Sequence, residues 1–127
     1  MLVAGGAGVV GHATIQLARW AGAEVITTVS SAAKAALAAA AGAHHIVNYR
    51  EEDAAAAIRN IAPQGVNIIV EVAPAANAEL DVAVLAPVEP ARMAVTLLLS
   101  GPAAAAAADA LAQAGFTDVR VVGDEVG

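Results

Sequence analysis

The chain has 127 residues and no cysteine, and 59% of its residues are hydrophobic although it holds only one Phe, one Tyr and one Trp. This length suits one domain with a core of Val, Ile, Leu and Ala, and the absence of thiols excludes disulfides and zinc sites with sulfur ligands. The formal net charge of -6 opposes nucleic acid and anionic membrane surfaces, so we expect neither as a partner.

The elements expected from the sequence alternate between strands and helices. Short β-branched runs recur every roughly 20 residues, and alanine-rich segments with helical spacing lie between them. In chain order, strands are expected at Leu2–Ala4, Glu24–Val29, His45–Asn48, Asn67–Val72, Met93–Leu98 and Asp118–Val122. Helices are expected at Val10–Ala21, Ala32–Ala41, Asp53–Ile61, Asn77–Leu85 and Pro102–Ala114. Strands joined by helices are parallel, so this order predicts one doubly wound α/β domain over residues 1–127, with a six-stranded parallel sheet between two helical layers.

Residues at the expected helix ends agree with these boundaries. Ser31 and Asp53 stand where a side chain can cap the second and third helices. Gly22, Gly42 and Gly115 follow three of the helices, where a left-handed residue is favoured.

The first helix is expected to be amphipathic. One face, predicted to lie on the sheet, holds Val10, Thr14, Leu17 and Ala21, while His12, Gln16 and Arg19 are predicted to point away from it.

Three glycines between the first strand and the first helix form the pattern G-x-G-x-x-G. Gly6 would permit a tight turn, Gly8 would let a diphosphate approach the backbone, and Gly11 would let the helix pack close to the strand. The helix start then offers free N–H groups and a positive dipole end to phosphates. The alternative is a glycine turn that serves tight packing alone.

The end of the second strand indicates which dinucleotide would bind. NAD-binding domains place an Asp or Glu there, on the ribose 2′-hydroxyl. This chain instead has Ser30 and Ser31, followed by Lys34, so hydroxyls and an ammonium occupy the place where a carboxylate would repel a 2′-phosphate. The pattern favours NADP(H) over NAD. The competing interpretation is that Ser31 only caps a helix and Lys34 is only a solvated residue.

The segments "GGAGVVGHATIQLARWAGAEVITTVSS", "KAALAAAAGAHHIVNYR" and "VNIIVEVAPAAN" resemble the Rossmann-type cofactor domain of zinc-independent quinone oxidoreductases. These are zeta-crystallin-like members of the medium-chain dehydrogenase/reductase superfamily. The resemblance covers residues 1–87. It implies that Ser30, Lys34 and Tyr49 surround the 2′-phosphate of NADPH and that Gly8, Val9 and Val10 hold the diphosphate. It also implies that the segment from Ala73 to Asn77 borders the nicotinamide.

Residues 88–127 lack this resemblance and are expected to complete the sheet, as part of an excised, chimeric or engineered domain. Met1 directly precedes the expected first strand, so we expect no upstream segment for the second, catalytic domain of the family. We therefore expect an isolated NADP(H)-binding domain that binds better than it catalyses, with no catalytic or metal-binding residues of its own.

Two other functions stay open. One is a structural or engineered scaffold without a ligand, and the other is a residual NADPH-dependent quinone or enone reductase that completes its site in a homodimer. A methyltransferase is disfavoured because Ser30 and Ser31 replace the acidic residue that usually meets the ribose.

Charged residues interrupt every apolar run before it reaches the roughly 18 residues of a membrane span, despite a mean hydropathy of +0.69. No basic region precedes an apolar segment at the N-terminus, so no signal peptide and a cytoplasmic location are predicted.

His44 and His45 are expected at the N-terminal edge of the sheet, opposite the ligand crevice. Glu71, in an apolar strand, is the one ionisable group whose burial would be costly, so it should lie at the crevice end of its strand or find a partner in the fold.

Overall fold

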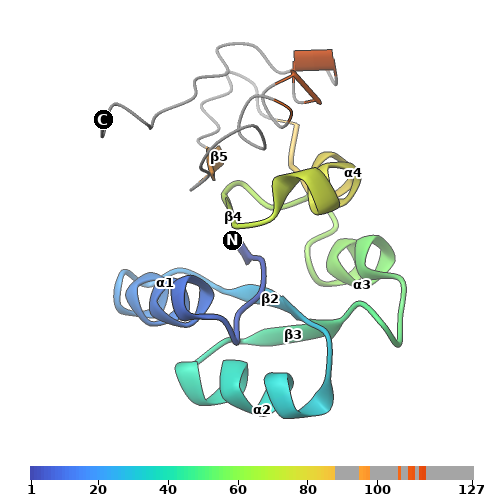
Figure 1. Ribbon diagram of the computed structural model, residues 1–127. Helices are drawn as coiled ribbons and strands as arrows, with labels where there is room; N and C mark the ends of the chain where they lie inside the picture. The colour runs from blue at the N-terminus through green and yellow to red at the C-terminus, as the bar shows by residue number, and fades with distance from the viewer. Residues whose placement is uncertain (88–94, 98–105, 107–108, 111, 114–127) are drawn as a thin grey trace, which may run out of the picture.

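The computed structural model describes residues 1–87, 95–97, 106, 109–110 and 112–113. Five strands form one parallel sheet in the order β3-β2-β1-β4-β5 (Figure 1). The strands are β1 (Leu2–Val3), β2 (Ile26–Val29), β3 (His45–Asn48), β4 (Ile69–Glu71) and β5 (Val95–Leu97). The helices are α1 (Val9–Trp20), α2 (Ala32–Ala41), α3 (Ala54–Ile61) and α4 (Pro74–Val84). The direction of strand progression reverses between β1 and β4, so the crevice of a doubly wound sheet is expected beside β1.

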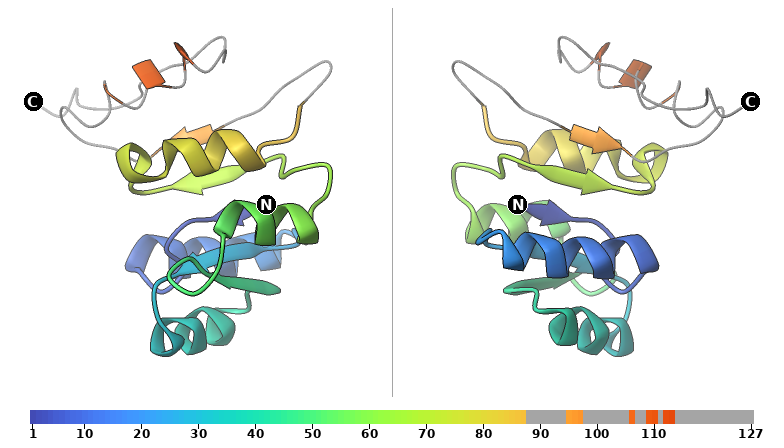
Figure 2. Two further views of the ribbon diagram at one scale, coloured as in Figure 1. Left: turned by 90° about the vertical axis from the view of Figure 1, so that its right-hand side faces the viewer. Right: turned by 90° about the vertical axis from the view of Figure 1, so that its left-hand side faces the viewer.

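Helices cover both faces of the sheet (Figure 2). Each face has its own apolar core. On one face Ile15 of α1 and Ala38 of α2 pack with Val3 of β1. On the other face Ile58 of α3 and Val84 of α4 pack in a second cluster. Right-handed crossovers dictate this division, because α1 and α2 accompany the strands that progress to one side of β1, and the chain then crosses back through α3.

The predicted doubly wound parallel α/β architecture is confirmed. Six strands were predicted, and the described residues form five. The predicted sixth strand, Asp118–Val122, lies outside these residues, as does Gly115. Of the predicted helix Pro102–Ala114, the few described residues are helical: Ala106, Asp109, Ala110, Ala112 and Gln113. Among the residues that the structure describes, no helix combines the length and apolar character needed to cross a bilayer.

Most predicted helix ends are confirmed. The Ser31 hydroxyl accepts from the Lys34 amide at 3.2 Å, and the Asp53 carboxylate accepts from the Ala56 amide at 3.1 Å. Gly22 and Gly42 follow α1 and α2 with φ of 86° and 104°. Both glycines thus occupy the left-handed region that ends many helices.

The predicted start of α4 at Asn77 is wrong. The helix begins three residues earlier, at Pro74, where the fixed φ of proline and its missing N–H suit a first turn. The side chain of Asn77 does not cap the helix, because it is turned toward Glu71.

The predicted buried face of α1 is also wrong. The residues that lie on the sheet are Gly11, Ile15 and Ala18, which share one face at helical spacing. Leu17, predicted to be buried, is 65% exposed. The small residues Gly11 and Ala18 on the inner face let the helix approach the sheet closely around Ile15, and Leu17 is left outside.

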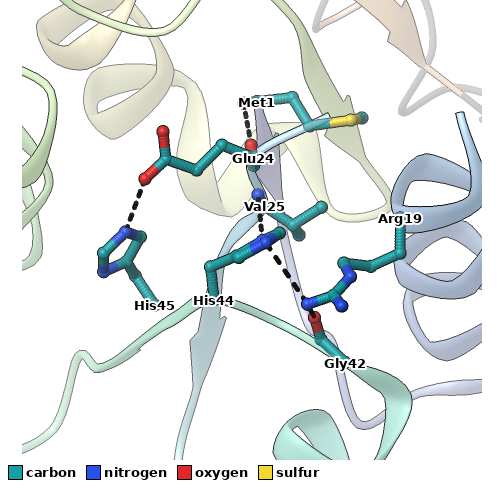
Figure 3. A network of polar contacts seen from close by, with 7 residues as sticks. All are labelled: Met1, Arg19, Glu24, Val25, Gly42, His44 and His45. Atoms are coloured by element: carbon teal, nitrogen blue, oxygen red, sulfur yellow. Dashed lines mark hydrogen bonds and ion pairs between the residues drawn. The ribbon is translucent and has the colours of Figure 1, made fainter. Parts of the chain in front are cut away.

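A polar network closes the N-terminal edge of the sheet (Figure 3). Arg19 at the end of α1 donates to the Gly42 carbonyl at 3.0 Å. The His44 ring accepts from the Val25 amide at 3.0 Å. His45 contacts the Glu24 carboxylate at 2.8 Å, and this hydrogen bond lowers the pKa of Glu24. Both histidines therefore hold loops together at the edge where the sequence placed them.

Candidate functional site

The turn between β1 and α1 is packed so closely that two of its positions have no room for a side chain. Gly5, with φ of 64°, is its left-handed residue, a role that the sequence pattern assigned to Gly6. A Cβ atom on Gly6 would overlap the Thr27 hydroxyl and lie 2.8 Å from Ile15 Cδ1. A Cβ on Gly11 would overlap the Gly5 carbonyl oxygen. Gly6 and Gly11 thus permit close packing of the turn against β2 and α1.

Gly8 has a different environment. Among the described residues, and leaving out its two chain neighbours, one atom lies within 4 Å of a Cβ placed there: the Gly5 carbonyl oxygen, at 3.3 Å. Gly8 is also exposed and is the N-cap of α1, where no side chain caps the helix and no acidic residue stands in the first turn. In contrast, α2 and α3 are capped by Ser31 and Asp53. The first amides of α1 are therefore open to an external acceptor, which is the arrangement that binds phosphate.

A cavity of about 350 Å³ opens at the carboxyl ends of the strands, next to this turn. Four of the predicted site residues line it: Gly8, Ser30, Lys34 and Tyr49. Six lining residues were not predicted, namely Gly5, Ala7, Thr28, Val29, Leu37 and Val72. The cavity thus joins the glycine turn to the ends of β2, β3 and β4, where ligands of open α/β sheets bind.

Lys34 and Ser30 form a polar pair on the β2 side of the cavity. Lys34 Nζ donates to Ser30 Oγ at 2.9 Å, and Lys34 is exposed. An ammonium and a hydroxyl so placed can together hold an anionic group that reaches them from the cavity. Ser31 lies beside them, but its hydroxyl caps α2 and it is not among the lining residues.

The other predicted residues lie around the cavity without lining it. Val9 and Val10 form the first turn of α1, and Val9 is 90% exposed. Ala73 is exposed at the N-cap of α4, next to the lining residue Val72. Gly6 and Gly11 are packed against neighbouring atoms inside the protein and do not line the cavity.

Two carboxylates are buried behind the β4 wall of the cavity. Glu71 is fully buried at the end of β4, where its carboxylate accepts hydrogen bonds from the amides of Val72 and Ala73 and from the Asn77 side chain. The sequence expectation that Glu71 finds a partner in the fold is thereby confirmed. Asp81, one turn after Asn77, is 3% exposed, and its Oδ1 has no hydrogen-bond partner among the described residues. Burial, and then the charge of Glu71, raise the pKa of Asp81 to about 7.

The buried Asp81 was not predicted from the sequence. Its burial depends on the packing of α4 against the sheet, which no local sequence signal reveals. Across the described part of the chain, no group of three His, Cys, Asp or Glu residues is placed to hold a metal ion.

The family model of the zinc-binding dehydrogenases matches residues 9–123. No curated protein matches the chain in sequence.

Several solved structures share the fold and about a third of the sequence. Quinone oxidoreductase of Escherichia coli complexed with NADPH is 34% identical, with a TM-score of 0.63 over 68% of this chain and 26% of that chain. A mycobacterial quinone oxidoreductase is 33% identical, with a TM-score of 0.67 over 90% of this chain and 35% of that one. A 2-haloacrylate reductase is 34% identical, with a TM-score of 0.65 over 68% of this chain and 27% of its own. The chain thus spans 26% to 35% of the length of these three proteins.

Proposed function

Because the chain belongs to the zinc-binding dehydrogenase family, we propose that it is the NADP(H)-binding part of an enzyme similar to quinone oxidoreductases. The observation that carries this proposal is the cavity that joins the open amides of α1 to the Lys34 and Ser30 pair. A diphosphate at the first site and a 2′-phosphate at the second would each meet groups that favour negative charge.

The residues present fit such a cofactor. Gly8 leaves room where the diphosphate would approach the backbone, and the cavity beside it is largely apolar, with Leu37 and Tyr49 on its far wall. Ser30 stands at the end of β2, where a carboxylate would accept from the 2′-hydroxyl of NAD and repel a 2′-phosphate. The site therefore favours NADP(H).

The bound nicotinamide would supply hydride chemistry, and this chain would bind and orient it. The reaction proposed for the whole enzyme is NADPH-dependent reduction of a quinone, as the names of the similar proteins suggest. Residues that recognise the substrate are expected in the remaining length of such proteins, which this chain does not span.

Titration with NADPH and NADH, followed by nicotinamide fluorescence, tests the proposal. We expect saturable binding of NADPH and weaker binding of NADH. If neither nucleotide binds at millimolar concentration, the proposal is wrong.

Charge reversal at Lys34 should weaken the binding of NADPH more than the binding of NADH. The substitution Lys34→Glu replaces an ammonium with a carboxylate next to Ser30, where the 2′-phosphate would lie. Since a hydrogen bond to a charged group contributes about 1.5–3 kcal/mol, we expect the Kd for NADPH to rise by at least about tenfold. The Kd for NADH, which lacks this phosphate, should change by less than about twofold. Equal losses for both nucleotides would contradict this placement of the 2′-phosphate.

A further inference from the structure

The turn between β4 and α4 is organised around one buried carboxylate. Glu71 Oε1 accepts from the Val72 amide at 2.8 Å, from the Ala73 amide at 2.6 Å and from Asn77 Nδ2 at 3.0 Å. Asn77 Nδ2 also contacts Glu71 Oε2 at 3.0 Å. The donors come from the residue after β4, from the N-cap of α4 and from the first turn of that helix. The Glu71 side chain therefore connects these three segments through hydrogen bonds.

This arrangement fixes the backbone that leads into α4. Ala73 is the N-cap residue of α4 and has no side chain that can accept a hydrogen bond. The Glu71 carboxylate instead accepts from the backbone amide of Ala73 itself, and its negative charge lies at the positive end of the helix dipole. The conformation of residues 72–73 therefore depends on Glu71.

Val72, between these hydrogen bonds, forms the β4 side of the cavity. The sheet order is β3-β2-β1-β4, so the glycine turn after β1 lies between the Lys34 side and the Val72 side. A dinucleotide with its 2′-phosphate at Lys34 and its diphosphate at the glycine turn has its nicotinamide half on the Val72 side.

We propose that Glu71 is a positioning residue that fixes the β4–α4 turn as the wall against which the nicotinamide half of the cofactor lies. The inference rests on the proposed function above. Glu71 acts through Val72 and the backbone of the turn, and it does not touch the cofactor.

Comparing the binding of two ligands distinguishes this role from a general loss of structure. NADPH occupies the whole site, whereas adenosine 2′,5′-bisphosphate carries the 2′-phosphate and the adenosine half but no nicotinamide. The substitution Glu71→Gln removes the negative charge that strengthens the hydrogen bonds from the Val72 and Ala73 amides, so the turn loosens. We expect the Kd for NADPH to rise by about tenfold and the Kd for adenosine 2′,5′-bisphosphate to change by less than about twofold, both measured by isothermal titration calorimetry.

Asn77→Ala provides a second, milder variant in case Glu71→Gln does not fold. It removes a single donor to Glu71 and places a good helix former in α4, so a smaller loss that is again confined to NADPH is expected. Glu79→Gln, which removes a charge from the exposed side of the same helix, is the matched control and should change neither Kd.

The outcomes distinguish a failure of the proposed function from a failure of the inference about Glu71. If the unmodified chain binds neither ligand, the proposed function is wrong and this inference with it. If the unmodified chain binds both and the Glu71 and Asn77 variants weaken both ligands equally, or weaken neither, the inference alone is overturned.

Discussion

Replacing Gly11 with alanine is expected to lower the free energy of unfolding by about 3 kcal/mol or more, the range of severe overpacking. The added Cβ would overlap the Gly5 carbonyl oxygen and lie 2.8 Å from Gly5 C and 2.9 Å from Gly6 Cα. All three are backbone atoms of a turn held on both sides, so they cannot move aside cheaply. Alanine gains about 1 kcal/mol over glycine in helix propensity, which is too little to offset the overlap. Urea denaturation followed by circular dichroism measures the difference.

Gly8→Ala is the matched control in the same turn. Among the described residues outside its chain neighbours, its Cβ would meet one atom, the Gly5 carbonyl oxygen at 3.3 Å, and the backbone of Gly8 has an ordinary φ of -74°. We expect stability to fall by about 1 kcal/mol, less than for Gly11→Ala, since one tight contact replaces the overlap with three backbone atoms. The NADPH affinity of this variant should nevertheless fall, because the methyl group would occupy the approach of the diphosphate. Equal destabilisation by the two substitutions would refute this division of roles between the glycines.

The fold was predictable because its signals are local. Alternating strand and helix patterns gave the parallel order, and the bounds of α2 and β3 agree with the structure at both ends. Ser31 and Gly42 mark the ends of α2 through the chemistry of single residues, which does not depend on the rest of the chain.

Predictions failed where packing overrides local pattern. In α1 the apolar residue Leu17 is exposed, because the close approach permitted by Gly11 selects the face that also carries Ile15 and Ala18. In α4 the polar residue Asn77 was taken for the helix start, but its side-chain amide donates to the Glu71 carboxylate and the helix begins at Pro74.

The candidate site was predictable only in part for the same reason. Gly8, Ser30 and Lys34 belong to sequence patterns with a known chemical purpose, and the structure brings them around one cavity. Leu37 and Val72 line that cavity through the tertiary arrangement of α2 and β4, which no short motif encodes.

The domain is expected to lose stability as the pH rises from about 4 to about 8, because of Asp81. The pKa of this carboxyl is raised by burial and by Glu71 to about 7 in the folded state, against 3.8 for an unperturbed group. Between these values the folded state holds a proton that the unfolded state has released, so the stabilisation present at low pH is lost as the pH passes through 7. A difference of this size corresponds to about 4 kcal/mol as an upper value.

Asp81→Asn should remove most of this pH dependence, because the amide resembles the protonated carboxyl in shape and charge. The variant is expected to match the unmodified chain near pH 4 within about 1 kcal/mol and to exceed it in stability by a growing margin as the pH rises toward 8. Urea denaturation at pH 4, 5, 6, 7 and 8 gives both slopes. Glu79→Gln makes the same change of charge on the exposed side of α4 and should keep the original slope, since no burial penalty acts there. Parallel curves for the unmodified chain and the Asp81 variant would mean that Asp81 is ionised in the folded protein near pH 5, and that a compensating positive group faces it.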